Sequence, residues 1–195
     1  MEAIDRSLFW WINSHSNTFL DWTLWTFSQH WSWLIVILLV YVFTTLRHDR
    51  GNWLWVLVGV ALCFLLADQI SNNAIKEGVQ RLRPCHAMEG VRMFHTGKGG
   101  LYGFVSSHAA NSFAIAMFFS LLYGGGKKEG ARWRGEWVPW VMFVWAAVVC
   151  YSRAYLGKHY PGDLVCGALL GLGVGALVYF AMSRIKLWIS SRREA

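Results

Sequence analysis

The chain has few cysteines and few charged residues for its length of 195 residues, and both shortages narrow the choice of fold. Its four cysteines are Cys63, Cys85, Cys150 and Cys166. Three of the four lie in apolar segments, and none forms a Cys-x-x-Cys pair. This set argues against a zinc site or a disulfide framework, and buried free thiols are expected instead. No repeat marks a second domain. We expect no cleavable signal peptide, because no small-residue cleavage site follows an apolar core near the N-terminus.

The chain is rich in apolar and aromatic residues. Hydrophobic residues make up 55% of it and aromatic residues 16%, with thirteen tryptophans. Such values are typical of helical membrane proteins, whose tryptophans collect at the two bilayer interfaces. The net charge of +7 could indicate nucleic acid, but no basic stripe is interleaved with a soluble fold. We therefore expect membrane lipids, and no nucleic acid, as its partners.

The apolar runs predict an all-α fold, a polytopic transmembrane helical bundle with five clear spans. The expected spans are residues 31–46, 53–75, 105–123, 137–151 and 164–182. In residues 1–30, polar side chains interrupt the apolar ones, which predicts an amphipathic interfacial helix or a sixth span. Residues 31–189 would form one membrane-embedded domain, followed by a basic cytoplasmic tail at residues 190–195.

The alternation of spans places residues 76–104 and residues 152–163 on one membrane face. The opposite face holds ten of the eighteen lysines and arginines. Short cytoplasmic loops retain positive charge, so the first face is expected to be extracytoplasmic. The prediction is a multi-pass membrane protein whose polar loops lie on the extracytoplasmic side.

Three groups of polar residues meet at that face. Lys76 and Arg83 lie at the end of the second span and just after it. Ser106, Ser107 and His108 lie at the start of the third span. Arg153, His159 and Asp163 lie between the fourth and fifth spans. Arginine forks match phosphate oxygens, lysine adds a point charge, and a helix N-terminus offers free amides to an anion. A patch for lipid headgroups would need the cations but not the histidine–aspartate pair. The sequence therefore predicts a phosphate site.

The spacing of these groups carries a resemblance. A lysine is followed after six residues by Arg83-Pro84, a Ser-x-His opens a span, and Ser152-Arg153 is followed by a histidine and, four residues later, an aspartate. This three-part pattern resembles the signature of the type 2 phosphatidic acid phosphatase superfamily, which is related to the vanadium haloperoxidases. It covers roughly residues 50–180. The second part departs from the usual Pro-Ser-Gly-His, because Ser107 replaces the glycine whose backbone amide contacts phosphate in the family.

The resemblance implies a role for each residue. His159 would attack phosphorus to give a phosphohistidine, and Asp163 would bind its other ring nitrogen. His108 would protonate the leaving oxygen and then activate water. The phosphate-binding set would be Lys76, Arg83, Arg153 and the amides near Ser106 and Ser107. The resemblance implies neither a metal nor another cofactor.

The short chain and compact loops resemble the small bacterial members of the superfamily. This resemblance implies hydrolysis of a lipid phosphomonoester or diphosphate at the bacterial inner membrane, with the active site facing the periplasm or the cell exterior. Undecaprenyl diphosphate is placed first and lipid A phosphate second, with phosphatidylglycerol phosphate and phosphatidate behind; the oligomeric state is left open. The rivals from other classes are a small transporter and an intramembrane serine protease using Ser106 or Ser107. Arg81, Arg92 and Lys98 are expected to contact headgroups or solvent. Close helix packing is expected at Gly167, Gly171 and Gly175.

Overall fold

The computed structural model describes residues 2–46, 50–124 and 135–193, and regular structure in these ranges is helical. One isolated antiparallel bridge joins Leu82 to Tyr102. The helices in chain order are α1 (Glu2–Ser14), α2 (Thr18–Ser28), α3 (His30–Tyr41), η1 (Val42–Leu46), η2 (Arg50–Asn52), α4 (Trp53–Gln69), η3 (Ile70–Lys76), α5 (Glu77–Val79), α6 (Pro84–Ala87), α7 (Ser107–Tyr123), α8 (Trp137–Tyr155) and α9 (Pro161–Arg193). The all-α prediction is confirmed.

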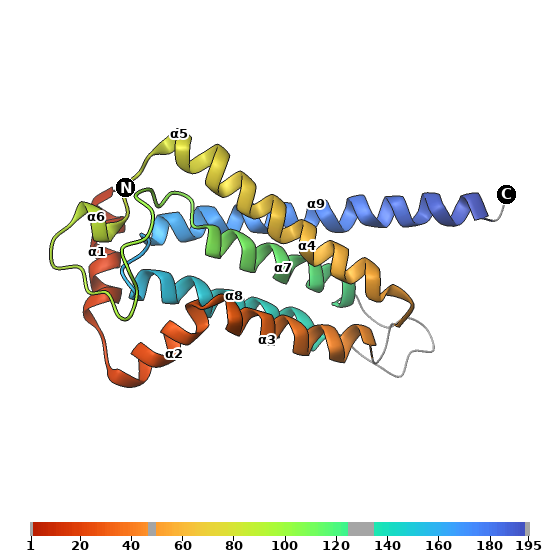
Figure 1. Ribbon diagram of the computed structural model, residues 1–195, viewed down its shortest axis with the longest axis horizontal. Coiled ribbons are helices and arrows are strands. Elements are labelled where there is room, and N and C mark those ends of the chain that lie inside the picture. The colour runs from red at the N-terminus through yellow and green to blue at the C-terminus, as the bar shows by residue number, and fades with distance from the viewer. Residues whose placement is uncertain (1, 47–49, 125–134, 194–195) are drawn as a thin grey trace.

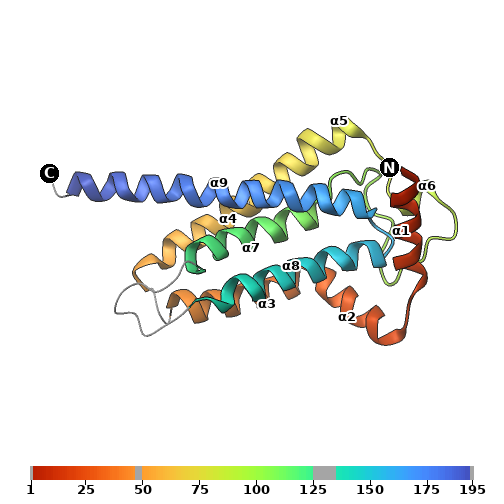
Figure 2. The same ribbon diagram turned by 180° about the vertical axis from the view of Figure 1, so that it is seen from behind.

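Helix α7 is the centre of the bundle. It packs against α4, α8 and α9, and all of these run along the long axis of the molecule together with α3 (Figure 1). The main hydrophobic core lies between these helices and includes Val56, Phe119, Met142 and Val178. Helix α1 instead crosses one end of the bundle, next to the loop that carries α6 (Figures 1 and 2).

Glycines let α9 approach α7 very closely, as the four-residue spacing predicted. A Cβ atom added at Gly171 would lie 2.3 Å from the carbonyl oxygen of Ala110, and one at Gly175 would lie 2.3 Å from that of Ala114. At Gly167 the same atom would lie 2.6 Å from the carbonyl oxygen of Ser106. Because only a residue without a side chain fits there, these contacts fix where the first turn of α7 lies relative to α9.

Three helical segments are long and apolar enough to cross a membrane: Trp53–Val79, Trp137–Tyr155 and Pro161–Arg193. The pair of α2 and α3 passes the same test as one span with a bend of 71°. The central α7 has only 17 residues. Among the described residues there are thus three candidate membrane spans, or four with the bent pair, by length and composition, and the predicted total of five or six remains a prediction.

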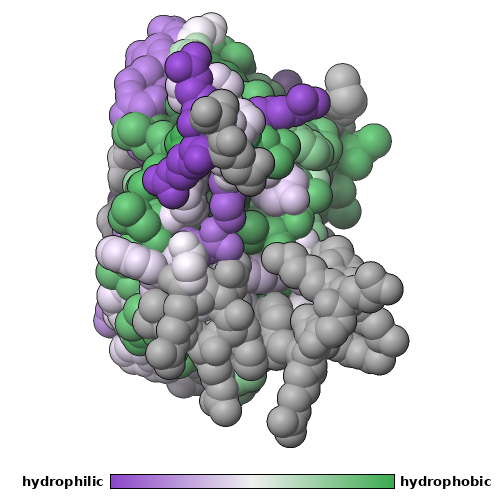
Figure 3. Space-filling view, turned by 90° about the vertical axis from the view of Figure 1, so that its right-hand side faces the viewer, coloured by the Kyte–Doolittle hydropathy of each residue, from purple (hydrophilic) through white to green (hydrophobic). Residues whose placement is uncertain are grey.

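Several predicted boundaries were wrong. The second span continues to Val79 and the fourth to Tyr155, so Arg153 lies inside a helix and not in a loop. The fifth starts at Pro161 and runs to Arg193, so residues 190–193 of the predicted tail continue the helix, and residues 194–195 lie outside the described residues. Figure 3 views the molecule from the end where α9 terminates and shows hydrophilic residues gathered there, with hydrophobic residues on the flanks.

The N-terminal helices are tied to the end of the bundle that α1 crosses. The side-chain amide of Asn13 donates to the carbonyl oxygens of Tyr155 (2.8 Å) and Arg92 (2.9 Å). In α2, Asp21 accepts from the guanidinium of Arg92 at 2.5 Å and from the hydroxyl of Tyr155 at 2.6 Å. Phe9 of α1 is fully buried. Residues 2–28 therefore contribute to the wall around the polar end of the bundle.

Candidate active site

The predicted site residues converge on the end of the bundle that α1 covers. They are contributed by the last turns of the second span, the first turn of α7, the end of α8 and the turn into α9. Most of them are buried: Lys76, Ser106, Ser107, Arg153, His159 and Asp163. Charges buried at this density are costly unless they are paired or await a charged ligand.

His159 lies at the centre of the group and has a defined tautomer. The Nη1 atom of Arg83 is 3.1 Å from its Nε2. Because a guanidinium only donates, Nε2 must be the acceptor and the ring proton must be on Nδ1. Nδ1 faces Oδ2 of Asp163 at 3.6 Å, which is longer than a hydrogen bond. The lone pair on Nε2 therefore faces the cations.

The surroundings of His159 also keep it neutral. Burial, followed by the positive charges of Arg83 and Arg153, holds the pKa of the His159 imidazole well below its ordinary value. A histidine can act as a nucleophile only in its neutral form. The environment of His159 therefore favours the form of the imidazole that the predicted nucleophile role requires.

Asp163 has a partner that the sequence did not suggest. Its Oδ1 accepts from Nη1 of Arg81 at 2.7 Å, and its Oδ2 accepts from the backbone amide of Tyr160 at 3.1 Å. Arg81 was expected to contact headgroups or solvent, and that expectation was wrong. The missed signal was chemical: a carboxylate with no exposed surface needs a cationic partner, and Arg81 lies on the same membrane face as Asp163.

The first turn of α7 provides amides and a cap. The hydroxyl of Ser106 accepts from the amide of Ala109 at 3.5 Å, and the amide of Ser106 donates to the carbonyl of Asp163 at 3.1 Å. The Ser106 side chain therefore serves as the helix N-cap. The two amides that follow it, those of Ser107 and His108, are the ones that this helix N-terminus leaves for an anion.

The side chain of Ser107 turns toward Lys76. The Lys76 ammonium donates to the Ser107 hydroxyl at 2.6 Å and to Oδ1 of Asn72 at 2.5 Å. The Ser107 hydroxyl in turn lies 2.9 Å from the same Asn72 oxygen. Two of the three ammonium hydrogens are thus used within the protein, which leaves one for a ligand. The serine that replaces the family's glycine fixes a cation of the site.

The bend between α2 and α3 forms the remaining wall. The hydroxyl of Ser28 accepts from Nη1 of Arg153, and the Ser28 backbone hydrogen-bonds the imidazole of His108. The His108 ring also lies beside the rings of His30 and Trp33, with centroid distances of 5.2 and 5.1 Å. No pattern in the sequence pointed to Ser28. Its contacts show that the N-terminal segment reaches the site.

Two buried atoms of the site have no hydrogen-bond partner among the described residues: Nε of Arg153 and Nδ1 of His159. Nδ1 of His159 faces Asp163 at 3.6 Å, whereas Nε of Arg153 is a buried donor without a partner in the described part of the chain, as expected where a ligand binds. In the described ranges no group of three histidine, cysteine or acidic residues could hold a metal ion. Cys85 and His86 line an open cavity of about 470 Å³ within their own loop.

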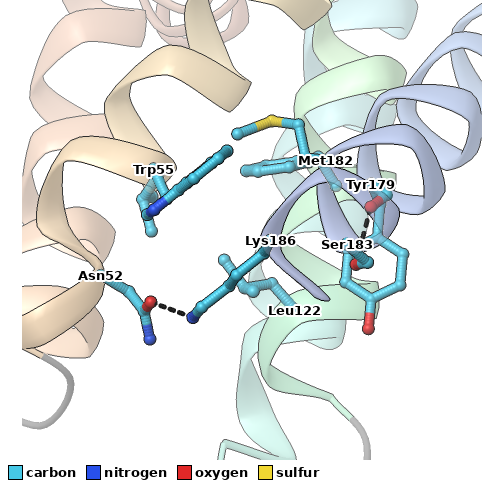
Figure 4. A pocket seen from close by; sticks show the side chains of 9 residues that line it. Asn52, Trp55, Leu122, Tyr179, Met182, Ser183 and Lys186 are labelled. Carbon is cyan, nitrogen blue, oxygen red and sulfur yellow. Dashed lines mark hydrogen bonds between the residues drawn. The ribbon is translucent and has the colours of Figure 1, made fainter. Parts of the chain in front are cut away.

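The opposite end of the bundle holds a small cleft that lacks these features. It is lined mainly by apolar side chains from α4, α7 and α9, with Lys186 bonded to Asn52 at its mouth (Figure 4). Its volume is about 60 Å³, and neither a histidine nor a carboxylate lines it. The cleft therefore cannot supply the acid–base chemistry that the other end can.

A buried histidine–aspartate pair, three cations and free helix amides at one end of an apolar helical bundle define a class of protein, the membrane phosphatases. Comparison with known families agrees: the model of the PAP2 superfamily matches residues 52–186. The chain belongs to this superfamily, as the resemblance implied, and is a hydrolase of the lipid phosphatase type.

Curated relatives match over nearly the whole chain. The chain is 32% identical to a lipid A 4'-phosphatase of Bacteroides thetaiotaomicron, covering 98% of this chain and 82% of the relative. It is 29% identical to a lipid A 4'-phosphatase of Porphyromonas gingivalis, covering 97% and 75%. The crystal structure of a transmembrane PAP2-type phosphatidylglycerolphosphate phosphatase from Bacillus subtilis has the same fold, with a TM-score of 0.66, 19% identity and coverage of 96% and 87%.

Proposed function

We propose that the protein removes the 4'-phosphate of lipid A at the extracytoplasmic face of the bacterial inner membrane. The observation that carries this proposal is the match to lipid A 4'-phosphatases over almost the full chain, N-terminal helices included. The sequence alone placed undecaprenyl diphosphate first and lipid A second. The relatives favour the second, and undecaprenyl diphosphate is no longer the leading substrate.

The geometry supports a two-step phosphoryl transfer. Nε2 of His159 attacks phosphorus as the bond to the leaving sugar oxygen breaks, and Asp163 stabilises the imidazolium that develops. For this attack Arg83 must leave Nε2, 3.1 Å away, and move onto the phosphoryl oxygens. His108 donates a proton to the leaving oxygen and later takes one from the water that hydrolyses the phosphohistidine.

The charge of the transferring phosphoryl group is balanced by the protein alone in this proposal. Lys76, Arg83 and Arg153 surround His159 closely enough to influence its charge. Together with the amides that follow Ser106, they stabilise the equatorial oxygens, as metal ions do in other phosphoryl-transfer enzymes. The reaction therefore proceeds without a metal.

The test is a substrate panel with purified protein in detergent and EDTA: lipid A, undecaprenyl diphosphate, phosphatidylglycerol phosphate and phosphatidate. We expect fastest release from lipid A, with mass spectrometry placing the loss at the 4'-position. His159→Ala should abolish release, while His15→Ala, at an exposed histidine outside the site, should not. Faster release from undecaprenyl diphosphate would reverse the substrate order, and loss of activity on chelation would contradict the metal-free mechanism.

The orientation needs a separate test. A single cysteine at position 98, in a protein whose four native cysteines are replaced, should react with a membrane-impermeant thiol reagent added to intact spheroplasts. A cysteine at position 186, near the other end of the bundle, should react only after lysis. The opposite pattern would place the site on the cytoplasmic side.

A further inference from the structure

Asp163 is a carboxylate with no exposed surface, and its two oxygens have different neighbours. Oδ2 faces Nδ1 of His159 at 3.6 Å and accepts a hydrogen bond from the Tyr160 amide, whereas Oδ1 accepts one from Arg81 at 2.7 Å. A buried carboxylate keeps its charge when it is paired and hydrogen-bonded. The Arg81 contact is therefore the ion pair that lets Asp163 stay ionised beside His159.

Arg81 is itself held from three sides. Its Nη2 donates to Oδ2 of Asp5 in α1 at 2.6 Å, and its guanidinium lies 4.2 Å from the centre of the Tyr160 ring. The other oxygen of Asp5 accepts from the amide of Gly162 at 2.7 Å. One chain of contacts thus runs from α1 through Arg81 to the first turn of α9, where the charge partner of His159 lies.

These contacts separate Arg81 from the phosphate-binding arginines. Both of its terminal nitrogens donate to carboxylates, so the positive charge of Arg81 is already paired within the protein. Arg153, in contrast, has a buried Nε without a partner among the described residues, and Arg83 contacts the nucleophilic nitrogen of His159. Arg81 acts on the reaction through Asp163 and not on the phosphate.

We propose that Arg81 is a positioning residue for phosphoryl transfer: it holds Asp163 in the rotamer that orients His159, and Asp5 of α1 keeps Arg81 in place. This rests on the proposed phosphatase function. It also gives α1 a function, because Asp5 of this helix holds Arg81 from outside the site. The role belongs to the attacking step, since Asp163 stabilises the imidazolium that forms there.

The test compares Arg81→Ala and Arg81→Lys with Arg92→Ala in full-length protein. Arg92 is the matched control, because it also ties an N-terminal helix to the same loop through an aspartate, Asp21. We expect Arg81→Ala to lower kcat by about 10²-fold, the order of loss for a misplaced catalytic group, while KM changes little because the phosphate ligands remain. Arg92→Ala should keep kcat within a few-fold of the wild-type value.

Chemical rescue separates positioning from general structural support. Added guanidinium ion should restore part of the kcat of Arg81→Ala by filling the vacated site between the carboxylates, and should do nothing for Arg92→Ala. Arg81→Lys should remain impaired, because one ammonium cannot span Asp5 and Asp163 as the fork does. Asp5→Asn should show a smaller loss, since Arg81 can still reach Asp163.

Two outcomes would overturn the inference: wild-type kcat in Arg81→Ala, or a loss that follows a lowered Tm and is not rescued by guanidinium. Each variant is also measured on an aryl phosphate, which reports the chemistry without the lipid. If the wild type cleaves the aryl phosphate but not lipid A, the substrate proposal fails and the same comparison still decides the role of Arg81. If it cleaves neither, both proposals fail.

Discussion

The replacement of the family's glycine by Ser107 yields a quantitative prediction. Ser107→Ala removes one of the two acceptors that hold the Lys76 ammonium and leaves Asn72 as the other. A hydrogen bond to a charged group contributes about 1.5–3 kcal/mol, and a change of about 1.4 kcal/mol in the barrier is tenfold in rate. Because Asn72 remains, we expect the lower end of this range, a fall of about tenfold in kcat/KM.

The assay is kcat/KM for phosphate release by Ser107→Ala, Asn72→Ala and the double variant. Because both side chains act on the same ammonium, the loss of activity in the double variant should differ from the product of the two single losses. Ser112→Ala is the matched control, since this buried serine lies in the same helix and its hydroxyl donates to the carbonyl of Ala109 within that helix, at 3.3 Å. It should keep full activity.

The reasoning is refuted if Ser107→Ala stays within twofold of the wild type while Lys76→Ala is inactive. In that case Lys76 would matter but its contact with Ser107 would not. Equal losses in Ser107→Ala and Ser112→Ala would instead point to a packing effect of α7.

Three other predictions follow from the site and the helix packing. Arg83→Gln should move the acidic limb of the kcat/KM–pH profile to higher pH, because Arg83 helps to depress the pKa of His159 and a higher pKa leaves less neutral histidine at low pH; an unmoved limb would contradict this. Gly171→Ala should cost about 1–3 kcal/mol by overpacking against α7, seen as a Tm lower by several degrees, while Gly173→Ala, with open space around it, should change little. Activity should survive dialysis against EDTA, measured as phosphate release before and after adding Mg²⁺.

The sequence was sufficient to group the site residues because span alternation placed their turns on one membrane face. The spacing from Lys76 to Arg83 and from His159 to Asp163 added the resemblance to the superfamily signature. The glycine spacing of α9 likewise predicted its contact with α7. Local periodicity and side-chain chemistry carry this information, so no tertiary structure was needed.

The ends of the helices could not be predicted in the same way. Polar residues such as Arg153 suggested a loop, yet the structure continues the helix to Tyr155 because the side chain is buried against Ser28. At the other end, α9 continues to Arg193 through a basic stretch with good helix formers. Tertiary contacts and helix propensity here outweighed the polarity that hydropathy detects.

The partners of the site residues were missed for a different reason. Arg81 and Asp163 are 82 positions apart, and Ser28 and Arg153 are 125 apart. Neither pair belongs to a periodic pattern or a motif. Such contacts depend on how the bundle brings its ends together, and a single sequence does not encode that locally.

Two contacts made by the N-terminal segment, through Asp5 and Ser28, reach opposite halves of the proposed reaction. Asp5 in α1 holds Arg81, which holds the partner of the attacking His159. Ser28, at the bend after α2, contacts the proposed general acid His108 and the phosphate ligand Arg153. This segment precedes residues 52–186, the region that the family model matches, but lies within the match to the lipid A 4'-phosphatases. The proposed reacting groups therefore lie in the region that the family model matches, while Asp5 and Ser28, which contact their neighbours Arg81 and Arg153, lie outside it.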